Sequence, residues 1–526
     1  MTAATRLEPA APHRLMLGTS CLLALSLLFT ACAVADIPTA QSVGYTLIES
    51  TVVPTAPPEP TATPVPTPVS EVAGDASVAD VPPTATPTPI PQPGVSASTL
   101  RLGIIGDIDT GGGDDGGSID GYASAAFDAI AAWARLKNDQ GGIAGRRIEI
   151  VPRDSGFGFH PDAVRWMCDP QTDVFALVGS KSFFDGDGID LFDDGVCPIP
   201  DFPTAALSSE RRQAPNTFLA NPWLSLYYQV GPLNWLADRH PGAADNAAVL
   251  LHSTTTSRIE TDRLAEALED TYSFVVREQV RYDENYVGRV ETLRDAGAQS
   301  LIWTLSADRL VQFLAARAFV GPDGENEDEL AFIVCIEDCY SRTFLADAGS
   351  LAEGVYTVLP HLPFDEANFS PELGQYLAAH DRLDNPGAAP STVGVQAWNA
   401  ARLFEEALDL SLGDGPTYDP DSIDRERVIG AAGRIDAWDA RGILGSEASP
   451  AGRIPSPCYV LMQVQDGQWS RVHPLTPGNM DCTATNLAIT RVTAGLTGGS
   501  RPPAPRPVDD AAVTDEVVGS ADPLDQ

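Results

Sequence analysis

Basic side chains are scarce in this sequence. Its 526 residues include 33 Lys and Arg against 72 Asp and Glu, for a formal net charge of −39. Because contacts from basic side chains to phosphates supply much of the affinity for nucleic acids, a chain this acidic is a poor nucleic-acid binder. The acidic residues are scattered over the whole chain, so they identify no cationic ligand. Their expected effect is to keep an exported protein soluble.

The common signatures of enzyme active sites are also missing. The sequence has no H-E-x-x-H, no G-x-S-x-G and no G-x-x-x-x-G-K-[ST] motif, and its 7 histidines are isolated. Gly179 to Ser182 imitates only the end of a phosphate-binding loop. We therefore predict that the protein is not an enzyme and holds no cofactor.

Long apolar runs are absent after the N-terminal segment, so nothing beyond it is expected to span a membrane. Leu15 to Phe29 is apolar but too short for a spanning helix, and Arg6 and Arg14 precede it. This pattern is typical of an export signal, which we place at residues 1–32.

The end of this signal resembles that of a bacterial lipoprotein. The residues are Thr30–Ala31–Cys32, and the resemblance implies that Cys32 carries a lipid that anchors the protein to the membrane. Phe29 departs from the lipoprotein pattern, which more often has Leu there. Ordinary signal cleavage near Ala35 is the alternative, and either process exports the protein.

Aromatic residues are nearly absent from residues 33–98, which instead contain the Pro/Thr tracts VPTAPPEPTATPVPTPV and VPPTATPTPIPQPG. Such a segment buries too little to fold, and its prolines keep it extended. We predict a disordered, semi-rigid linker. The acidic residues 483–526 are likewise predicted to be disordered, most clearly from Gly498, where Pro and Asp are frequent.

A strand, a glycine-rich loop and a helix follow the linker. Leu102 to Ile108 reads as a buried strand, and Gly111 to Gly117 form the loop. Tyr122, Ala126, Ile130 and Trp133 then recur at helical spacing, and Arg147 to Val151 forms a second strand. The glycines do not fit the dinucleotide fingerprint, and the aspartates of the loop do not fit an EF-hand, so a solvated loop is favoured over a nucleotide or metal site.

This alternation of strands and helices continues and predicts an α/β fold, in two lobes at this length. At the C-terminal end, YVLMQVQDGQWSRV reads as a hairpin that turns at Asp466–Gly467. The further predicted strands are 247–251, 274–280, 300–305, 330–335 and 355–359, and the predicted helices are 225–239, 261–270, 308–320 and 396–412.

Three segments carry a family resemblance: GGIAGRRIEIVPRDSG from Gly141, VFALVG from Val174, and CPIPDFPTAALSS from Cys197. They resemble, in order, segments of the type I periplasmic binding proteins, most closely the branched-chain amino-acid (Leu/Ile/Val) binding subgroup. The resemblance runs from about residue 100 to about residue 472. It implies two Rossmann-like lobes joined by a three-crossover hinge, with residues 99–220 and 360–455 in lobe 1 and residues 221–359 and 456–482 in lobe 2.

Ligands of open α/β sheets bind beyond the carboxyl ends of the strands. The resemblance places the carboxylate of a ligand in lobe 1 and puts Glu337 of lobe 2 against its ammonium. Relatives often have a Tyr in the loop at residues 254–256, and its absence here puts amino-acid specificity in doubt. The implied ligand-binding residues are Ser180, Lys181, Ser182, Thr204, Ala205, Ala206, Thr255, Thr304 and Glu337.

Eight cysteines remain to be sorted. Cys21 lies within the export signal and is removed with it, and Cys32 is the candidate site of the lipid anchor. In an exported chain the other six are expected to form disulfides, and neighbours in sequence are the favoured partners. A zinc half-site at Cys335 and Cys339 is the alternative for that pair, but no second Cys or His pair matches it. The predicted disulfides are Cys168–Cys197, Cys335–Cys339 and Cys458–Cys482.

The function that these features favour is the capture of a small solute, such as an amino acid, an amide or a related organic acid, for an ABC importer. The expected partners are the solute, the permease subunits of the importer and, through the lipid, a membrane. A sensor or surface-adhesion module with the same fold and no transport role is the alternative.

Overall fold

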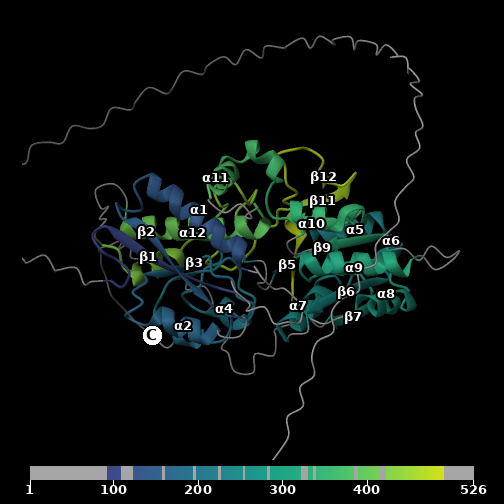
Figure 1. The fold of residues 1–526 in the computed structure, drawn as a ribbon, viewed down its shortest axis with the longest axis horizontal. Coiled ribbons are helices and arrows are strands. Elements are labelled where there is room, and N and C mark those ends of the chain that lie inside the picture. Colours follow the sequence, from purple (N-terminus) through teal and green to yellow (C-terminus); the bar gives the residue numbers. More distant parts are fainter. Residues whose placement is uncertain are drawn as a thin grey trace, which may run out of the picture. The chain divides into compact units, whose positions relative to one another are not determined.

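A computed structural model of the chain describes residues 92–107, 123–156, 160–193, 197–222, 227–252, 255–280, 285–321, 330–335, 339–383, 389–413 and 422–490. All of them belong to one compact unit, residues 85–526. They form two main β-sheets with helices packed against them (Figure 1). Within these residues, no helix combines the length and the apolar character needed to cross a membrane.

The first sheet has four parallel strands in the order β2 (Arg147–Asp154), β1 (Thr99–Gly106), β3 (Ala176–Val178) and β4 (Asp201–Phe202). Side chains of β1 alternate between two hydrophobic clusters because successive residues of a strand point to opposite faces. Leu102 and Ile104 pack with helices α1 (Ser124–Asp139) and α12 (Thr392–Leu412). Ile105 packs on the other face with α2 (His160–Cys168). Both faces are thus covered, which explains the continuous apolar run.

The second sheet has seven strands in the order β12-β11-β10-β9-β8-β6-β7. β6 (Ala247–His252), β7 (Phe274–Val280), β8 (Ser300–Trp303), β9 (Phe332–Cys335) and β10 (Tyr356–Leu359) are parallel. Helices α8 (Tyr286–Asp295), α9 (Ala307–Val320) and α10 (Arg342–Ala348) share one cluster with this sheet, and α5 (Gly231–Arg239) and α7 (Thr255–Ala267) share another.

β11 (Val460–Gln465) and β12 (Gln468–His473) form the predicted hairpin at the edge of this sheet. The two turn residues have positive φ, 53° at Asp466 and 73° at Gly467. Two successive positive φ values are what a two-residue hairpin turn of type I′ requires, and Asp-Gly is among the sequences that adopt it most readily.

The chain passes between the elements of the two sheets three times. It leaves the first sheet after β4 and returns after β10 to form α11 (Pro371–His380), α12 and α13 (Arg425–Ala432), and then it re-enters the second sheet at β11. The remaining elements are α3 (Asp190–Asp193), α4 (Ser209–Gln213), β5 (Tyr227–Gln229), α6 (Pro241–Ala244), the 3-10 helices η1 (Gly349–Ala352), η2 (Phe364–Phe369) and η4 (Ala484–Asn486), and β13 (Leu487–Ile489).

Several predictions from the sequence are wrong at their boundaries, including the helix predicted at residues 261–270, which lies at Thr255–Ala267. The helix predicted from residue 225 begins at Gly231, because Tyr227–Gln229 forms β5 instead. β13 pairs antiparallel with β5, so residues 484–489 are folded where a disordered tail was predicted from residue 483. The last residues of the predicted linker are also folded, since Val95 forms a β-bridge with Leu100 and Gln92 Nε2 donates to Asp424 Oδ2 at 2.7 Å.

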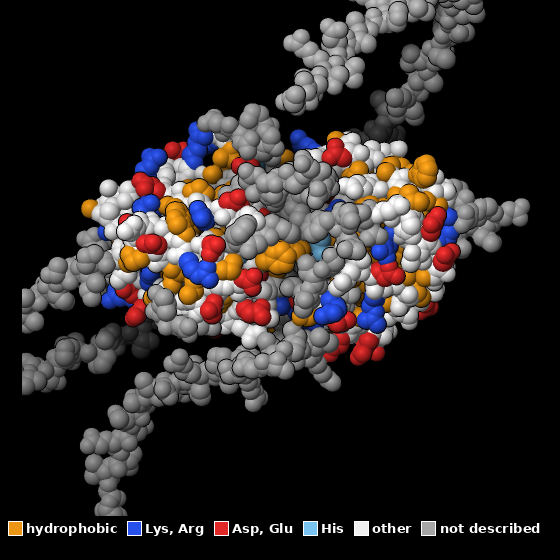
Figure 2. Space-filling view, turned by 60° about the horizontal axis from the view of Figure 1, so that its bottom comes forward, with side chains coloured by type: hydrophobic (Ala, Val, Ile, Leu, Met, Phe, Trp, Pro, Cys, Tyr) orange, Lys and Arg blue, Asp and Glu red, His pale blue; other side chains and the backbone are white. Residues whose placement is uncertain are grey.

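Acidic and basic side chains lie intermingled on the face drawn in Figure 2. This mixture agrees with the scattered charge pattern of the sequence and indicates no concentration of acidic residues there. The export signal, Cys32 and residues 491–526 lie outside the described residues.

The structure contains the three disulfides that the sequence predicts. Cys168 is bonded to Cys197, Cys335 to Cys339 and Cys458 to Cys482, with sequence separations of 29, 4 and 24 residues. Cys168 ends α2 and Cys335 ends β9, so each of these two bonds ties a loop back to a regular element.

Replacing Cys168 and Cys197 together by Ser should destabilise the protein more than replacing Cys335 and Cys339 together. Closing the longer loop removes more entropy from the unfolded chain, by roughly 3 to 4 kcal/mol against roughly 2 kcal/mol for the shorter loop. Urea unfolding of the two double variants and the oxidised parent measures the difference. A larger loss from the Cys335–Cys339 pair would contradict the loop-entropy explanation.

Candidate functional site

A buried hydrogen-bond network joins the carboxyl ends of β1, β2 and β3. Ser155 Oγ donates to Asp107 Oδ1 at 2.6 Å, and the hydroxyls of Ser155 and Ser182 are 2.8 Å apart. Because the hydroxyl proton of Ser155 is used in the hydrogen bond to Asp107, the hydroxyl of Ser182 donates to Ser155. The backbone N–H of Phe183 donates to Asp107 Oδ2 at 2.7 Å. Asp107 therefore fixes the loop that follows β3.

Gly179 shapes the same loop. Its φ is +80°, and a Cβ added there would lie 2.3 Å from Ile130 Cγ1, so glycine is required on two grounds. Ser180 follows, and its Oγ accepts from the N–H of Ile105 at 3.1 Å. The N–H of Lys181 donates to the carbonyl of Ile105 at 2.9 Å and extends the sheet pairing by one residue. Both side chains are buried.

Thr204 follows β4 at the adjacent strand end. Its N–H donates to the carbonyl of Ser180 at 3.0 Å, and its Oγ1 donates to the carbonyl of Gly179 at 2.7 Å. The predicted first-lobe residues Ser180 and Thr204 are therefore brought together. Ala205 is half-buried and Ala206 is buried beside them.

Two second-sheet residues of the prediction, Thr255 and Thr304, follow strands of that sheet. Thr304 follows β8, and its Oγ1 donates to the carbonyl of Leu250 at 2.9 Å. Thr255 is the first residue of α7. Glu337, predicted to face a ligand ammonium, lies outside the described residues.

Most hydroxyl protons of the predicted binding residues are used in hydrogen bonds within the protein. Thr204, Thr304 and Ser182 each donate to a protein acceptor, so they offer lone pairs and no proton to a further group. Ser180 accepts from Ile105 and keeps its own proton. In this arrangement the hydroxyls of Thr204, Thr304 and Ser182 offer no proton to a carboxylate, which only accepts hydrogen bonds.

Two contacts join the strand-end loops of the two sheets. The rings of Phe183 and His252 meet edge to face, with centroids 5.2 Å apart. Arg212 of α4 forms an ion pair with Glu260 of α7, with 3.0 Å between Nη1 and Oε1. Burial, followed by the nearby positive charge of Arg309, lowers the pKa of His252 to about 4, so its ring is neutral at pH 7.

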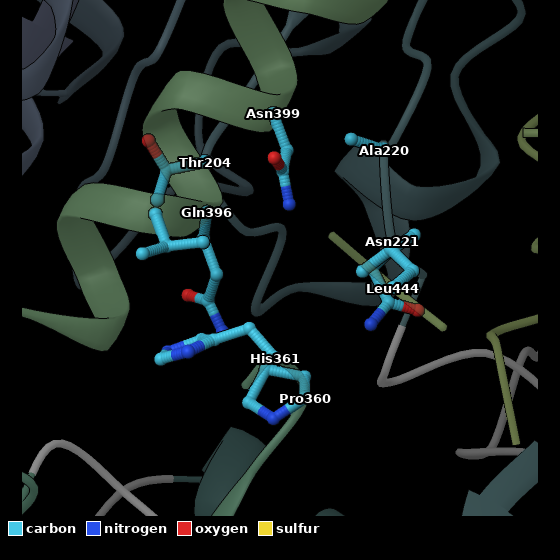
Figure 3. A pocket seen from close by; sticks show the side chains of 9 residues that line it. Thr204, Ala220, Asn221, Pro360, His361, Gln396, Asn399 and Leu444 are labelled. Carbon is cyan, nitrogen blue, oxygen red and sulfur yellow. The ribbon is translucent and has the colours of Figure 1, made fainter. Parts of the chain in front are cut away.

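A pocket lies next to Thr204, on the side of the segments that pass between the sheets (Figure 3). Its volume is about 280 Å³ when the open solvent at its mouth is included. Its walls come from β4, from α12 and from the passing segments. The lining residues are Thr204, Ala220, Asn221, Pro360, His361, Val395, Gln396, Asn399 and Leu444.

His361 is fully buried and neutral. Its Nδ1 lies 2.7 Å from the carbonyl of Leu362, which can only accept, so Nδ1 carries the proton. Nε2 then accepts from Thr392 Oγ1 at 3.3 Å. The ring stacks on Phe364 with centroids 5.3 Å apart. Burial, partly opposed by the bond to Leu362, lowers the pKa of His361 to about 4.

None of the nine lining side chains carries a charge at neutral pH, because His361 is neutral and the others are amides, an alcohol or apolar groups. Asn221 uses its Oδ1 to accept from the N–H of Ser456 at 3.2 Å. The described residues contain no group of three or more His, Cys, Asp and Glu side chains placed to hold a metal ion. The pocket therefore suits an uncharged, hydrogen-bonding group.

Of these lining residues, the sequence predicts Thr204 as a binding residue but does not predict His361, Gln396 or Asn399. No local signal marks Gln396 or Asn399, because the helical neighbours of Asn399 at positions i−3 and i+3 are the polar residues Gln396 and Arg402. No local pattern marks His361, because only the return of the chain after β10 brings it beside Thr204.

The neutral state of His361 makes the stability of the protein depend on pH. Its pKa is about 4 in the folded protein and about 6.5 when unfolded, so the unfolded chain binds the proton more readily. The stabilisation is complete above pH 6.5 and is lost as the pH falls to 4, by about 3 kcal/mol for this group. In His361→Gln, the free energy of unfolding should change less steeply between pH 6.5 and 4.5, as measured by urea unfolding.

His240→Gln is the matched control. His240 is only half-buried, and burial together with Arg239 lowers its pKa, so its removal should change the slope less. An unchanged slope in His361→Gln would show that His361 does not titrate as its buried position requires.

Comparison with known proteins agrees with the fold. A leucine-binding protein from Thermotoga maritima superposes with a TM-score of 0.55 at 12% identity, over 71% of this chain and 98% of that one. A fatty acid ABC transporter substrate-binding protein from Thermomonospora curvata gives a TM-score of 0.56 at 16% identity, over 76% and 96%. A solute-binding protein from R. palustris in complex with 4-hydroxybenzoate gives 0.55 at 17% identity, over 71% and 96%.

No match was found among curated proteins. The family model for periplasmic binding proteins matches residues 111–468, which is more than half of the chain, and confirms the resemblance seen in the sequence. The chain therefore belongs to the periplasmic binding protein family.

Proposed function

We propose that the protein captures a small solute between its two lobes outside the cytoplasm and delivers it to an ABC importer. Membership of the periplasmic binding protein family supports a binding role over an enzymatic one. The observation that carries the proposal is the meeting of Thr204, at a strand end of the first sheet, with residues of the segments that pass between the sheets, around one pocket. A ligand at such a place contacts both the lobe and the hinge.

The lobes of this proposal consist of residues 99–220 with 360–455 and residues 221–359 with 456–482. The solute is an amino acid, an amide or a related organic acid. The three similar proteins named above are named for, or hold, different solutes: leucine, a fatty acid and 4-hydroxybenzoate. At no more than 17% identity these neighbours indicate the fold and leave the solute open.

The proposed binding residues come from both lobes. Those of lobe 1 follow β3 and β4, and those of lobe 2 follow β6, β8 and β9 in the chain. Glu337 is the proposed partner of a cationic or hydrogen-donating end of the solute. The full proposed set is Ser180, Lys181, Ser182, Thr204, Ala205, Ala206, Thr255, Thr304 and Glu337.

Closing of the lobes over the solute is the proposed trapping step. The Arg212–Glu260 ion pair and the Phe183–His252 ring contact support it, because both join strand-end loops of different sheets. Arg263 Nη1 also contacts Glu260, at 3.0 Å from its Oε2. Two guanidinium groups therefore hold the carboxylate that joins α7 to α4.

A thermal-shift screen against amino acids, amides and organic acids tests the proposal. A solute that binds only the folded protein stabilises it by mass action, by about 2.7 kcal/mol at a concentration of 100 times Kd. We expect a concentration-dependent rise in Tm with at least one of these classes. A complete screen without any shift, confirmed by calorimetry, would contradict solute binding.

Membrane anchoring through Cys32 is the second part of the proposal. The motif Thr30–Ala31–Cys32 and the Pro/Thr-rich stretch after it support a lipid anchor followed by a spacer. Cys32→Ala should release the protein from the membrane fraction into the medium or periplasm, as measured by fractionation and immunoblotting. Cys21→Ala, within the signal, is the matched control and should leave the anchor intact. A Cys32→Ala protein that stays in the membrane fraction would rule out lipidation at Cys32.

A further inference from the structure

The chain continues past β12 as a segment that we call the strap, residues 474–490. It contains η4 and β13 and lies beyond residues 111–468, which the family model matches. Much of the strap is irregular, so its position depends on bonds to other parts of the chain. These bonds reach each of the three passages between the sheets, and they reach both lobes.

The second passage, between β10 and α11, is bonded to the strap through Glu366. Its Oε2 accepts from the backbone N–H of Gly478 at 2.7 Å, and its Oε1 accepts from Nε of Arg471 of β12 at 2.6 Å. Nη1 of Arg471 in turn donates to the carbonyl of Asn479 at 2.9 Å. Gly478 has a φ of +79°, and a Cβ there would lie 2.7 Å from the ring of Phe369, so glycine is required at this contact. This part of the strap therefore lies directly on the passage.

The third passage, between α13 and β11, is fastened to the strap covalently. Cys482 of the strap is bonded to Cys458 of the passage. The neighbouring residues Tyr459 and Asp481 exchange two backbone hydrogen bonds, each 3.0 Å long. A hydrogen bond adds little net stability, because water competes for the same groups. The disulfide is therefore the strongest attachment at this passage.

The first passage, between β4 and β6, contains β5, and β13 of the strap pairs with β5 in antiparallel direction. The N–H of Val230, which follows β5, donates to the carbonyl of Asn486 at 2.8 Å. At the end of the strap, Oγ1 of Thr490 accepts from Nε of Arg263 of α7 at 3.0 Å. The strap is thus attached to the first passage and to the second lobe.

Met480 attaches the strap to the first lobe. Its side chain packs against the hydrophobic cluster that contains residues of α1 and α12. A Cβ added at Gly445, in the segment after α13, would lie 2.7 Å from Sδ of Met480, so the two segments are in close contact. The strap therefore joins the two lobes beside the passages, in addition to its bonds with the passages themselves.

A hinge motion rotates one lobe against the other and is absorbed by a few residues of the connecting segments. Three separate passages can each bend on their own. A segment that is bonded to all three, and to both lobes, must break contacts or move with each of them when the lobes rotate. We propose that the strap braces the passages, is fastened by the Cys458–Cys482 disulfide, and limits how far the lobes open. This inference rests on the lobe closing of the proposed function and does not depend on which solute binds.

Single-molecule FRET on the full-length, solute-free protein tests the brace. The dyes are attached through p-acetylphenylalanine, which reacts without thiols, in place of two exposed residues, Arg165 of α2 and Arg277 of β7. In the Cys458→Ser/Cys482→Ser protein, the ratio of open to closed molecules should rise roughly fivefold, which corresponds to about 1 kcal/mol.

Cys168→Ser/Cys197→Ser is the matched control, because it also removes a disulfide, which here joins α2 to the segment before β4. It should leave the ratio unchanged. A folded Cys458→Ser/Cys482→Ser protein with the ratio of the parent would overturn the brace, even if its Tm is lower, because a purely local role of the disulfide affects stability alone.

Glu366→Gln is a second variant, for the case that the cysteine variant loses its fold. Gln has the shape of Glu but lacks the charge and one of the two acceptor oxygens, so the contact with the strap is weakened and the ratio should again rise. Its control is Glu353→Gln. Glu353 accepts from the backbone N–H groups of Asp466 and Gly467, at the hairpin turn and outside the strap, so its replacement should leave the ratio unchanged.

A failure of the brace and a failure of the proposed function give different results. Two populations of interlobe distance whose ratio is the same in the parent and in both strap variants would overturn the brace alone. One narrow population in every protein, unmoved by a solute that the thermal-shift screen identifies, would overturn the closing of the lobes as well.

Discussion

The position of helix α12 is the constraint on which the candidate site depends. Arg402 is buried in its middle and donates to Glu372 of α11 at 2.6 Å and to Glu405 at 2.7 Å. Glu372 Oε1 also accepts from Trp398 Nε1 at 2.6 Å. Burial alone would raise the pKa of Glu405, but its hydrogen bond with Lys137 of α1 and the charge of Arg402 hold it below its usual value. Removing one member of such a buried charged set leaves the others uncompensated, so the network fixes where α12 lies along α1 and α11. Asn399 lies between Trp398 and Arg402, and its place in the pocket follows from theirs.

Much of the fold was predictable because it depends on local periodicity. The strand at 274–280 and the end of the helix at Val320 were predicted as observed, and the hairpin turn at Asp466–Gly467 follows from turn chemistry alone. The errors lie where distant partners decide the structure. Tyr227–Gln229 is a strand only because Leu487–Ile489 pairs with it, more than 250 residues later in the chain. No pattern within either segment shows that pairing.

The candidate site also combines features that local patterns predict with features that depend on distant parts of the chain. Strand ends can be predicted from a sequence, and this is how Ser180 and Thr204 were found. In the structure the N–H of Thr204 donates to the carbonyl of Ser180. The state of their protons was not predictable, because it depends on which carbonyl lies nearby. The family resemblance implies a site built for a carboxylate and an ammonium, whereas the pocket beside Thr204 is lined by uncharged groups. The difference arises in the passing segments and in α12, whose alignment with Thr204 is a property of the whole fold.

The charged and uncharged contacts are suited to different steps of binding. The Arg212–Glu260 pair is largely buried, with exposed side-chain fractions of 12% and 15%, so the loss of water from both charges offsets much of their attraction. Such a pair can separate when the lobes open, because both charges then regain water, and its small net contribution does not by itself hold the lobes closed. A solute shifts such an equilibrium only through its different affinity for the two states. The uncharged pocket next to the segments that pass between the lobes can provide such a difference, because a hydrogen bond to the solute is worth most where water is excluded. The strength of closing would then depend on how well the uncharged end of the solute satisfies the pocket, and the ion pair at the strand ends would set the geometry in which the lobes meet.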